Sequence, residues 1–109
     1  MKKIIATTLM SVCLSATAHE STSPPQLWSD FKDLNTSKEA CEIQSLSVLE
    51  SLNLSNIIQN QYGIYGIFKS NRIVVKCLKQ GSKSKVWVAV AGHDRDTVEM
   101  LRNKIIQGI

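Results

Sequence analysis

Two cysteines in the body of the chain, Cys41 and Cys77, constrain the fold more than any other feature. A third cysteine, Cys13, lies in an N-terminal apolar stretch that we expect to be removed, which leaves an even number. Paired cysteines form disulfides in oxidising compartments, and a bridge at this spacing closes a loop of about 36 residues. A chain-entropy description assigns such a loop roughly 4 kcal/mol of stability. We therefore expect a Cys41–Cys77 disulfide that joins two elements of one small domain.

The first 18 residues have the three parts of a secretory signal peptide. Residues 2–3 are lysines, an apolar run extends over 4–14, and residues 16–18 read Ala-Thr-Ala, the pattern that signal peptidase cleaves. The run is shorter than the about 20 apolar residues that a bilayer span needs. Residues 1–18 are therefore predicted to be a signal peptide. The mature product is expected to be periplasmic or secreted, with no stable membrane insertion after cleavage.

The predicted mature chain consists of a leader, residues 19–35, and one folded domain, residues 36–109. Residues 19–25 are polar and end in two prolines, which is typical of a flexible segment. The apolar residues of 27–34 follow at spacings that suit a short amphipathic helix. A chain of this length makes a single domain with a modest core.

Two helices are predicted, one at each end of the domain. The first, residues 37–52, begins at a Thr36–Glu39 capping box, and its apolar stripe includes Cys41. The second, residues 97–107, begins at an Asp96–Glu99 cap and also has one apolar stripe. The first helix therefore points its cysteine into the core.

Three strands are predicted between the helices, at about 57–69, 72–79 and 85–91, and the sequence allows a break in the first near Asn60. These stretches are rich in β-branched and aromatic residues, and their apolar residues alternate. Ser70-Asn71 is expected to form the first hairpin loop, and residues 80–83 are expected to form the second turn.

The predicted fold class is α+β, in the order helix, three-stranded antiparallel sheet, helix (α-β-β-β-α). Both helices are expected on one face of the sheet, in a single domain stapled by the disulfide. Strand alternation places Cys77 on the core face of the sheet, and the first helix points Cys41 toward the same layer. Two independent periodicities thus bring the two cysteines together.

The opposite face of the sheet is the predicted binding site. It carries Tyr65, Val74, Lys76, Leu78 and Trp87, and the expected register puts the lysine and the two aromatic residues in one row. A lysine between two rings can make cation–π contacts, and so much apolar area is unusual for a solvated surface. Tyr and Trp dominate protein interfaces, so we expect a partner to bind here. Two alternatives remain open: the leader segment covers this face, or the face is a homodimer seam.

Charge is distributed unevenly along the chain. No acidic residue occurs between Glu50 and Asp94, whereas six lysines and arginines fall in this stretch. The sheet and its turns are therefore expected to be basic, which would steer an acidic partner. The export signal argues against nucleic acid as that partner. Edge-strand lysines that prevent aggregation are the alternative interpretation.

An imidazole and two carboxylates lie close together in residues 92–96, Gly-His-Asp-Arg-Asp. Such a group suits general acid–base chemistry. A turn glycine, a helix cap and a carboxylate that complements the helix dipole account for the same pattern. Cleavage after residue 18 would also free the amine of His19, which could chelate copper together with His93. No phosphate-loop, hydrolase or zinc motif occurs in the chain.

The expected function is non-enzymatic binding, of the inhibitor or immunity type, to an envelope or secreted protein through the outer sheet face. No cofactor and no metal site is expected. The alternatives are a small hydrolase or metal-binding protein centred on His93 and a structural envelope subunit.

Overall fold

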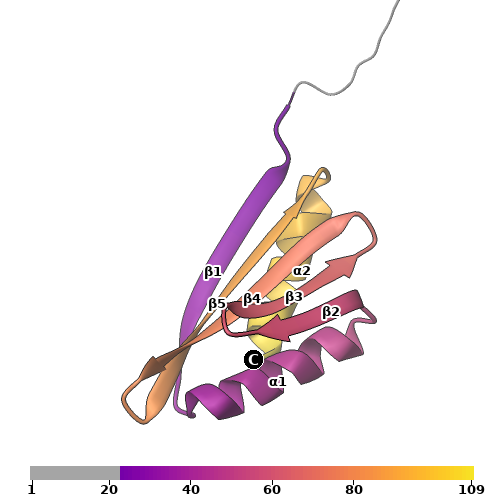
Figure 1. Ribbon diagram of the computed structural model, residues 1–109. Helices are drawn as coiled ribbons and strands as arrows, with labels where there is room; N and C mark the ends of the chain where they lie inside the picture. The colour runs from indigo at the N-terminus through magenta and orange to yellow at the C-terminus, as the bar shows by residue number, and fades with distance from the viewer. Residues whose placement is uncertain (1–22) are drawn as a thin grey trace, which may run out of the picture.

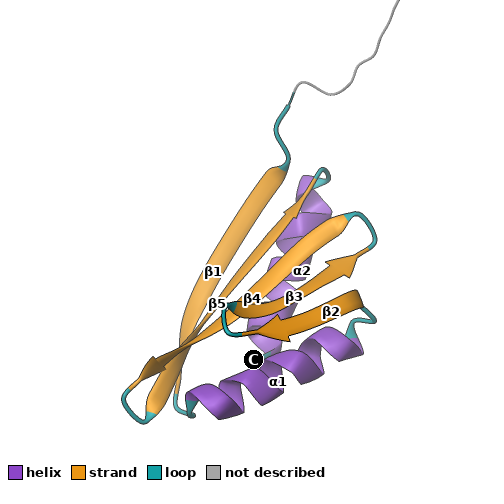
Figure 2. Ribbon diagram, in the orientation of Figure 1, coloured by secondary structure: helices purple, strands orange, loops and turns teal. Residues whose placement is uncertain are grey.

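A five-stranded antiparallel sheet with two helices on one of its faces forms the body of the protein (Figures 1 and 2). The computed structural model describes residues 23–109, so the predicted signal peptide, residues 1–18, and His19 lie outside the described part. The strands lie in the order β1-β5-β4-β3-β2. The elements are β1 (Gln26–Leu34), α1 (Lys38–Ser51), β2 (Ser55–Asn60), β3 (Gly63–Phe68), β4 (Asn71–Gln80), β5 (Lys83–Gly92) and α2 (Arg95–Gly108).

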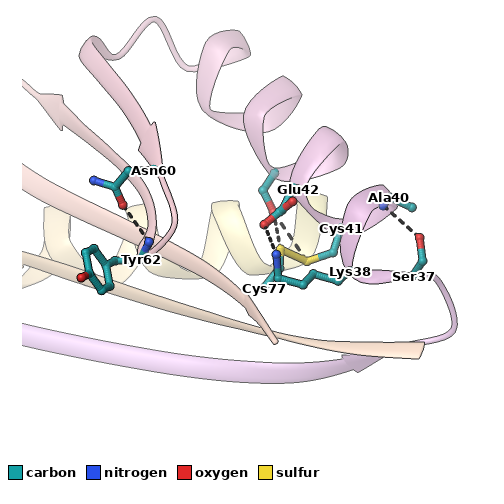
Figure 3. Close-up of polar contacts among 9 residues, drawn as sticks. Ser37, Lys38, Ala40, Cys41, Glu42, Asn60, Tyr62 and Cys77 are labelled. Carbon is teal, nitrogen blue, oxygen red and sulfur yellow. Dashed lines mark hydrogen bonds and ion pairs between the residues drawn. A yellow bond between two sulfur atoms is a disulfide. The ribbon is translucent and has the colours of Figure 1, made fainter. Parts of the chain in front are cut away.

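The prediction of a three-stranded sheet is wrong, because the order of elements is β-α-β-β-β-β-α. The single strand expected at 57–69 is in fact a hairpin, β2 and β3, that turns at residues 61–62. The carboxamide oxygen of Asn60 accepts a hydrogen bond of 2.8 Å from the backbone N–H of Tyr62 and so stabilises this turn (Figure 3). Gly63 follows with φ +151°, a conformation that a side chain would strain. The break that the sequence allows near Asn60 is therefore this turn, and the segments on its two sides are separate strands.

The short helix expected within residues 27–34 is also wrong, since this segment is strand β1, which pairs along its whole length with β5. Its apolar residues lie on both faces of the sheet and give no simple alternation. The indole ring of Trp28 lies on the helix side, where Arg95 and Arg102 place their guanidinium groups 5.1 and 5.3 Å from the ring. Lys32 donates a 3.0 Å hydrogen bond to the carbonyl of Ile106. Pairing with β5, which comes far later in the chain, therefore makes this segment a strand, and the contacts with α2 support it.

Helix α1 matches the prediction apart from its first turn. Ser37 is the N-cap, and its hydroxyl accepts a 3.1 Å hydrogen bond from the backbone N–H of Ala40 (Figure 3). The cap is one residue later than the expected Thr36. Cys41, Ser45 and Leu49 are buried on one face, as helical spacing requires.

The predicted Cys41–Cys77 disulfide is confirmed. It joins α1 to β4 across a Cα–Cα distance of 6.0 Å, and both residues belong to the buried core (Figure 3). The hydroxyl of the buried Ser45 lies 3.6 Å from the sulfur of Cys77. The bridge therefore fastens the helix layer to a central strand from inside.

The two-residue loop between β3 and β4 is Lys69-Ser70, one position earlier than expected. Lys69 adopts φ +55°, and the side chain of the buried Asn71 donates a 3.0 Å hydrogen bond to the carbonyl of Phe68. The register therefore differs from the expected one by two residues, which leaves every side chain on its expected face. The core between sheet and helices contains Cys41, Leu49, Ile64, Ile73, Val75, Cys77, Val86, Val88, Val90, Val98, Leu101, Ile105 and Ile106.

Helix α2 begins two residues earlier than predicted, with Asp94 rather than Asp96 as its N-cap. The carboxylate of Asp94 accepts hydrogen bonds from the hydroxyl and the backbone N–H of Thr97. These two hydrogen bonds hold the pKa of Asp94 below its ordinary value of 3.8, and the bond from the Thr97 hydroxyl has the larger effect. Because the folded-state pKa is lowered, the stabilisation is complete above the unfolded-state pKa and is lost as the pH falls through the folded-state pKa.

We expect the wild type to lose more stability than Asp94→Asn when the pH falls from about 5 to about 2. Asparagine keeps a good N-cap acceptor but does not titrate. Thermal melting of both proteins across this range is the measurement, with Asp94→Ala as the variant that lacks the cap at every pH. Equal pH dependence of the wild type and Asp94→Asn would show that this carboxylate contributes nothing to acid sensitivity.

Candidate functional site

The face of the sheet opposite the two helices is the candidate site, and we call it the outer face. Antiparallel pairing puts directly opposed residues on the same face, so the strand registers define its members. No helix within residues 23–109 covers it (Figure 1). The outer face contains Leu27, Ser29, Phe31, Asp33, Ser55, Ile58, Asn60, Gly63, Tyr65, Ile67, Arg72, Val74, Lys76, Leu78, Gln80, Lys83, Lys85, Trp87, Ala89 and Ala91.

All five predicted binding residues lie on the outer face. Lys76 is directly opposite Trp87, as expected, and Leu78 is opposite Lys85. Tyr65, however, is opposite Val74, one row away from the Lys76–Trp87 pair. The expectation of a single Tyr–Lys–Trp row is therefore wrong, because the β3–β4 hairpin turns one position earlier than expected.

Strand β1 extends the outer face instead of covering it. Phe31 lies directly opposite Trp87, on the side away from Lys76. The ammonium group of Lys85 lies 4.9 Å from the centre of the Phe31 ring, so the cation–π contact of this face involves these two residues. Leu27 and Phe31 are 71% and 59% exposed, which is high for large apolar side chains. The alternative in which the leader segment shields the sheet is thus overturned for residues 26–34.

A groove of about 370 Å³ lies in one half of the outer face. Ala89 and Ala91 of β5 form part of its floor, because their side chains are small. Leu27 lines it from β1, while Ile58 and Tyr65 line it from β2 and β3. The groove is therefore an apolar trough across the central strands, with large side chains on both sides.

The outer face is basic. Arg72, Lys76, Lys83 and Lys85 point outward from β4 and β5, whereas Asp33 is the one acidic residue among the outer-face members. Asp33 lies 3.7 Å from Lys85. Among the described residues, no carboxylate forms an ion pair with Arg72 or Lys76. Two cations beside exposed apolar area therefore remain available to an anionic group.

Sequence reasoning missed Leu27, Phe31 and Ile58 as outer-face residues. The first two lie on a strand that resembles a helix in its apolar spacing. Ile58 follows directly after Ile57, and a bulge in β2 between Ser55 and Ile58 removes the alternation that would have placed it. Arg72 could have been found, because it begins the series of alternate β4 residues that contains Val74 and Lys76.

The residues on either side of His93 make structural contacts. His93 is exposed between β5 and α2, and the neighbouring Asp94 uses its carboxylate to cap α2. The buried Gly92 packs against Asn71, where an added Cβ would lie 2.0 Å from the carboxamide oxygen. Within residues 23–109, no group of three or more His, Cys, Asp or Glu side chains is arranged to hold a metal ion.

The fold and the site define a disulfide-linked α+β domain with one open, basic and apolar sheet face. No protein-family model, curated protein or solved structure matches the chain. No helix in the described part of the chain is long and apolar enough to cross a membrane. A buried disulfide of this kind is typical of proteins in oxidising compartments.

Proposed function

We propose that the protein is a non-enzymatic binding protein, of the inhibitor or immunity type, that attaches to an acidic protein partner through the outer face. The observation that carries the proposal is the composition of this uncovered face. Trp87 lies between Phe31 and Lys76 in one row across three strands, and no helix in the described part of the chain covers this row (Figure 1). Large aromatic and basic residues are those that dominate binding energy in protein interfaces.

Burial of the exposed apolar area of the outer face would favour binding of a partner. Each exposed side chain removed from water contributes about 25 cal/mol per Å² of apolar area, before the costs of association. Leu27, Phe31 and Ile58 are more than half exposed, and Leu78 is 42% exposed. These four residues and Trp87 supply apolar area, and the cations Arg72 and Lys76 lie among them on the central strand β4.

The proposed location of this activity is the periplasm or the medium. Support comes from the signal-peptide pattern of residues 1–18 and from the disulfide, which reducing cytosol would not maintain. The partner is accordingly an envelope or secreted protein.

The test compares the oxidised mature protein with its Trp87→Ala variant as bait for envelope extract and culture medium. We expect one stoichiometric partner on the wild type and its loss on the variant, since a central Trp is worth about 2 kcal/mol or more at an interface. With the purified partner, isothermal titration should then show a Kd at least about 30-fold higher for the variant. Trp87 is on the outer face, so its truncation should leave the fold intact.

Met100→Ala is the control, because Met100 is a large apolar side chain, 44% exposed, that lies on α2 and not on the outer face. It should bind the partner as the wild type does. A partner that binds the wild type, Trp87→Ala and Met100→Ala equally would show that the binding site is not on the outer face. A wild type that is a stable dimer, with a monomeric Trp87→Ala variant and no captured partner, would instead make the face a homodimer seam.

A further inference from the structure

The outer face also indicates which kind of structure binds there, an inference that rests on the proposed function and specifies it. We infer that the groove binds an amphipathic α-helix of the partner, with apolar side chains over Ala89 and Ala91 and carboxylates at Arg72 and Lys76. Three observations support it: the backbone hydrogen bonding of the strands, the shape of the groove, and the positions of Arg72 and Lys76.

The backbone of the central strands is already paired. β5 lies between β1 and β4, and β4 lies between β5 and β3, so a chain that crosses this face finds few free N–H or C=O groups. An extended segment bound on this face would bury backbone N–H and C=O groups without hydrogen-bond partners, which is unfavourable in free energy. A helix satisfies its backbone internally and can therefore lie on the sheet.

The sheet edges are poor sites for an added strand. On β1, the carboxylate of Asp30 accepts a 2.8 Å hydrogen bond from the backbone N–H of Phe31, and both residues are exposed. On β2, the bulge between Ser55 and Ile58 and the φ of +54° at Asn56 interrupt the regular edge. Such features are the usual protection of an edge against strand addition.

The shape of the groove suits the side chains of a helix. Ala89 and Ala91 allow close approach, while Leu27 and Tyr65 line the groove from the strands on either side. This arrangement accepts a ridge of apolar residues spaced three and four apart.

The charges fix the chemical character of that helix. Arg72 and Lys76 are four residues apart on β4, or about 13 Å along the strand. Residues seven apart on a helix lie on one side, about 10.5 Å apart, and flexible Arg and Lys side chains cover the difference. Neither cation has a carboxylate partner among the described residues, and no acidic residue occurs between Glu50 and Asp94. The complementary helix is therefore acidic along one flank of its apolar stripe.

Three labelled peptides of about five turns test the inference without knowledge of the partner. The first has leucines at helical spacing with a flank of glutamates, the second replaces the glutamates by lysines, and the third is the acidic peptide with a central proline that breaks the helix. We expect the acidic helix to bind the oxidised protein at least tenfold more tightly than either other peptide, by fluorescence anisotropy at low salt. Half-molar salt should weaken this binding.

Charge reversal on the protein completes the test. Arg72→Glu and Lys76→Glu should each weaken binding of the acidic helix at least tenfold, whereas Lys104→Glu on α2 should leave it unchanged. Equal affinity for the acidic and basic peptides, equal affinity for the proline peptide, or no binding of any of them would overturn the inference. If vesicles with phosphatidylglycerol bind in an Arg72-dependent manner and the acidic helix does not, the face recognises lipid and the inference is wrong. Capture of a Trp87-dependent partner alongside a negative peptide result would leave the proposed function standing.

Discussion

Replacing Cys41 and Cys77 together by alanine should lower the free energy of unfolding by about 4 kcal/mol. The bridge spans a sequence separation of 36 residues, so its loss restores a large amount of conformational freedom to the unfolded chain. Small domains are stable by only about 5–15 kcal/mol, and this one has two thin layers. We therefore expect the double variant to be close to unfolding at 37 °C.

Denaturant titration by circular dichroism measures the effect, with the reduced wild type as the matched comparison. Both forms should give the same midpoint if the bridge acts mainly on the unfolded chain. Because Cys41 and Cys77 are buried in the core, reduction in native conditions should be slow and should follow the rate of global unfolding. Fast reduction without unfolding would contradict the burial of the bridge.

The second large effect is expected in α2. Leu101 is fully buried between the helix and the sheet, so Leu101→Ala should lower the free energy of unfolding by about 3 kcal/mol through lost apolar burial and the cavity that remains. Its neighbour Met100 points outward, and Met100→Ala should change stability by less than about 0.5 kcal/mol. The same denaturant titration measures both variants.

The contrast between adjacent positions makes the Leu101 prediction specific. A general intolerance of α2 to alanine would weaken both variants, whereas packing on the sheet affects Leu101 alone. Equal destabilisation of the two variants would mean that α2 does not dock through the face that contains Leu101 and Ile105. Since α2 also contacts β1, the Leu101→Ala variant should lose protection from hydrogen exchange in β1 as well.

Local signals predicted the elements that have strong periodicity. The helix expected at 37–52 is α1, Lys38–Ser51, and the strands expected at 72–79 and 85–91 are the central strands β4 and β5. Strand β1 could not be predicted, because Trp28 and Leu34 pack against the core on the helix side while Leu27 and Phe31 face outward. Its apolar residues therefore follow no period of two, and only the distant β5 makes the segment a strand.

The sequence was sufficient to predict which face of the sheet carries the candidate site, but not which strands contribute to it. Alternation along β4 and β5 placed Lys76, Leu78 and Trp87 outward, and a register error of two residues cannot change the face of a side chain. The same error displaced Tyr65 by one row. The contribution of β1, including Phe31 beside Trp87, depends on a strand pairing that local sequence does not encode.

Strand β1 comes first in the described chain, yet its sheet partner β5 comes last among the strands. The chain can therefore form the β2–β5 meander by neighbour-to-neighbour closure, but β1 must wait until everything between the two strands has been synthesised. Such distant closure is the entropically costly step and the slow one in folding. A chain truncated before β5 would leave the edge strand β1 without a partner. It would also lack the row of Phe31 and Trp87. Completion of the sheet and assembly of the row of Phe31 and Trp87 thus depend on the same pairing of β1 with β5.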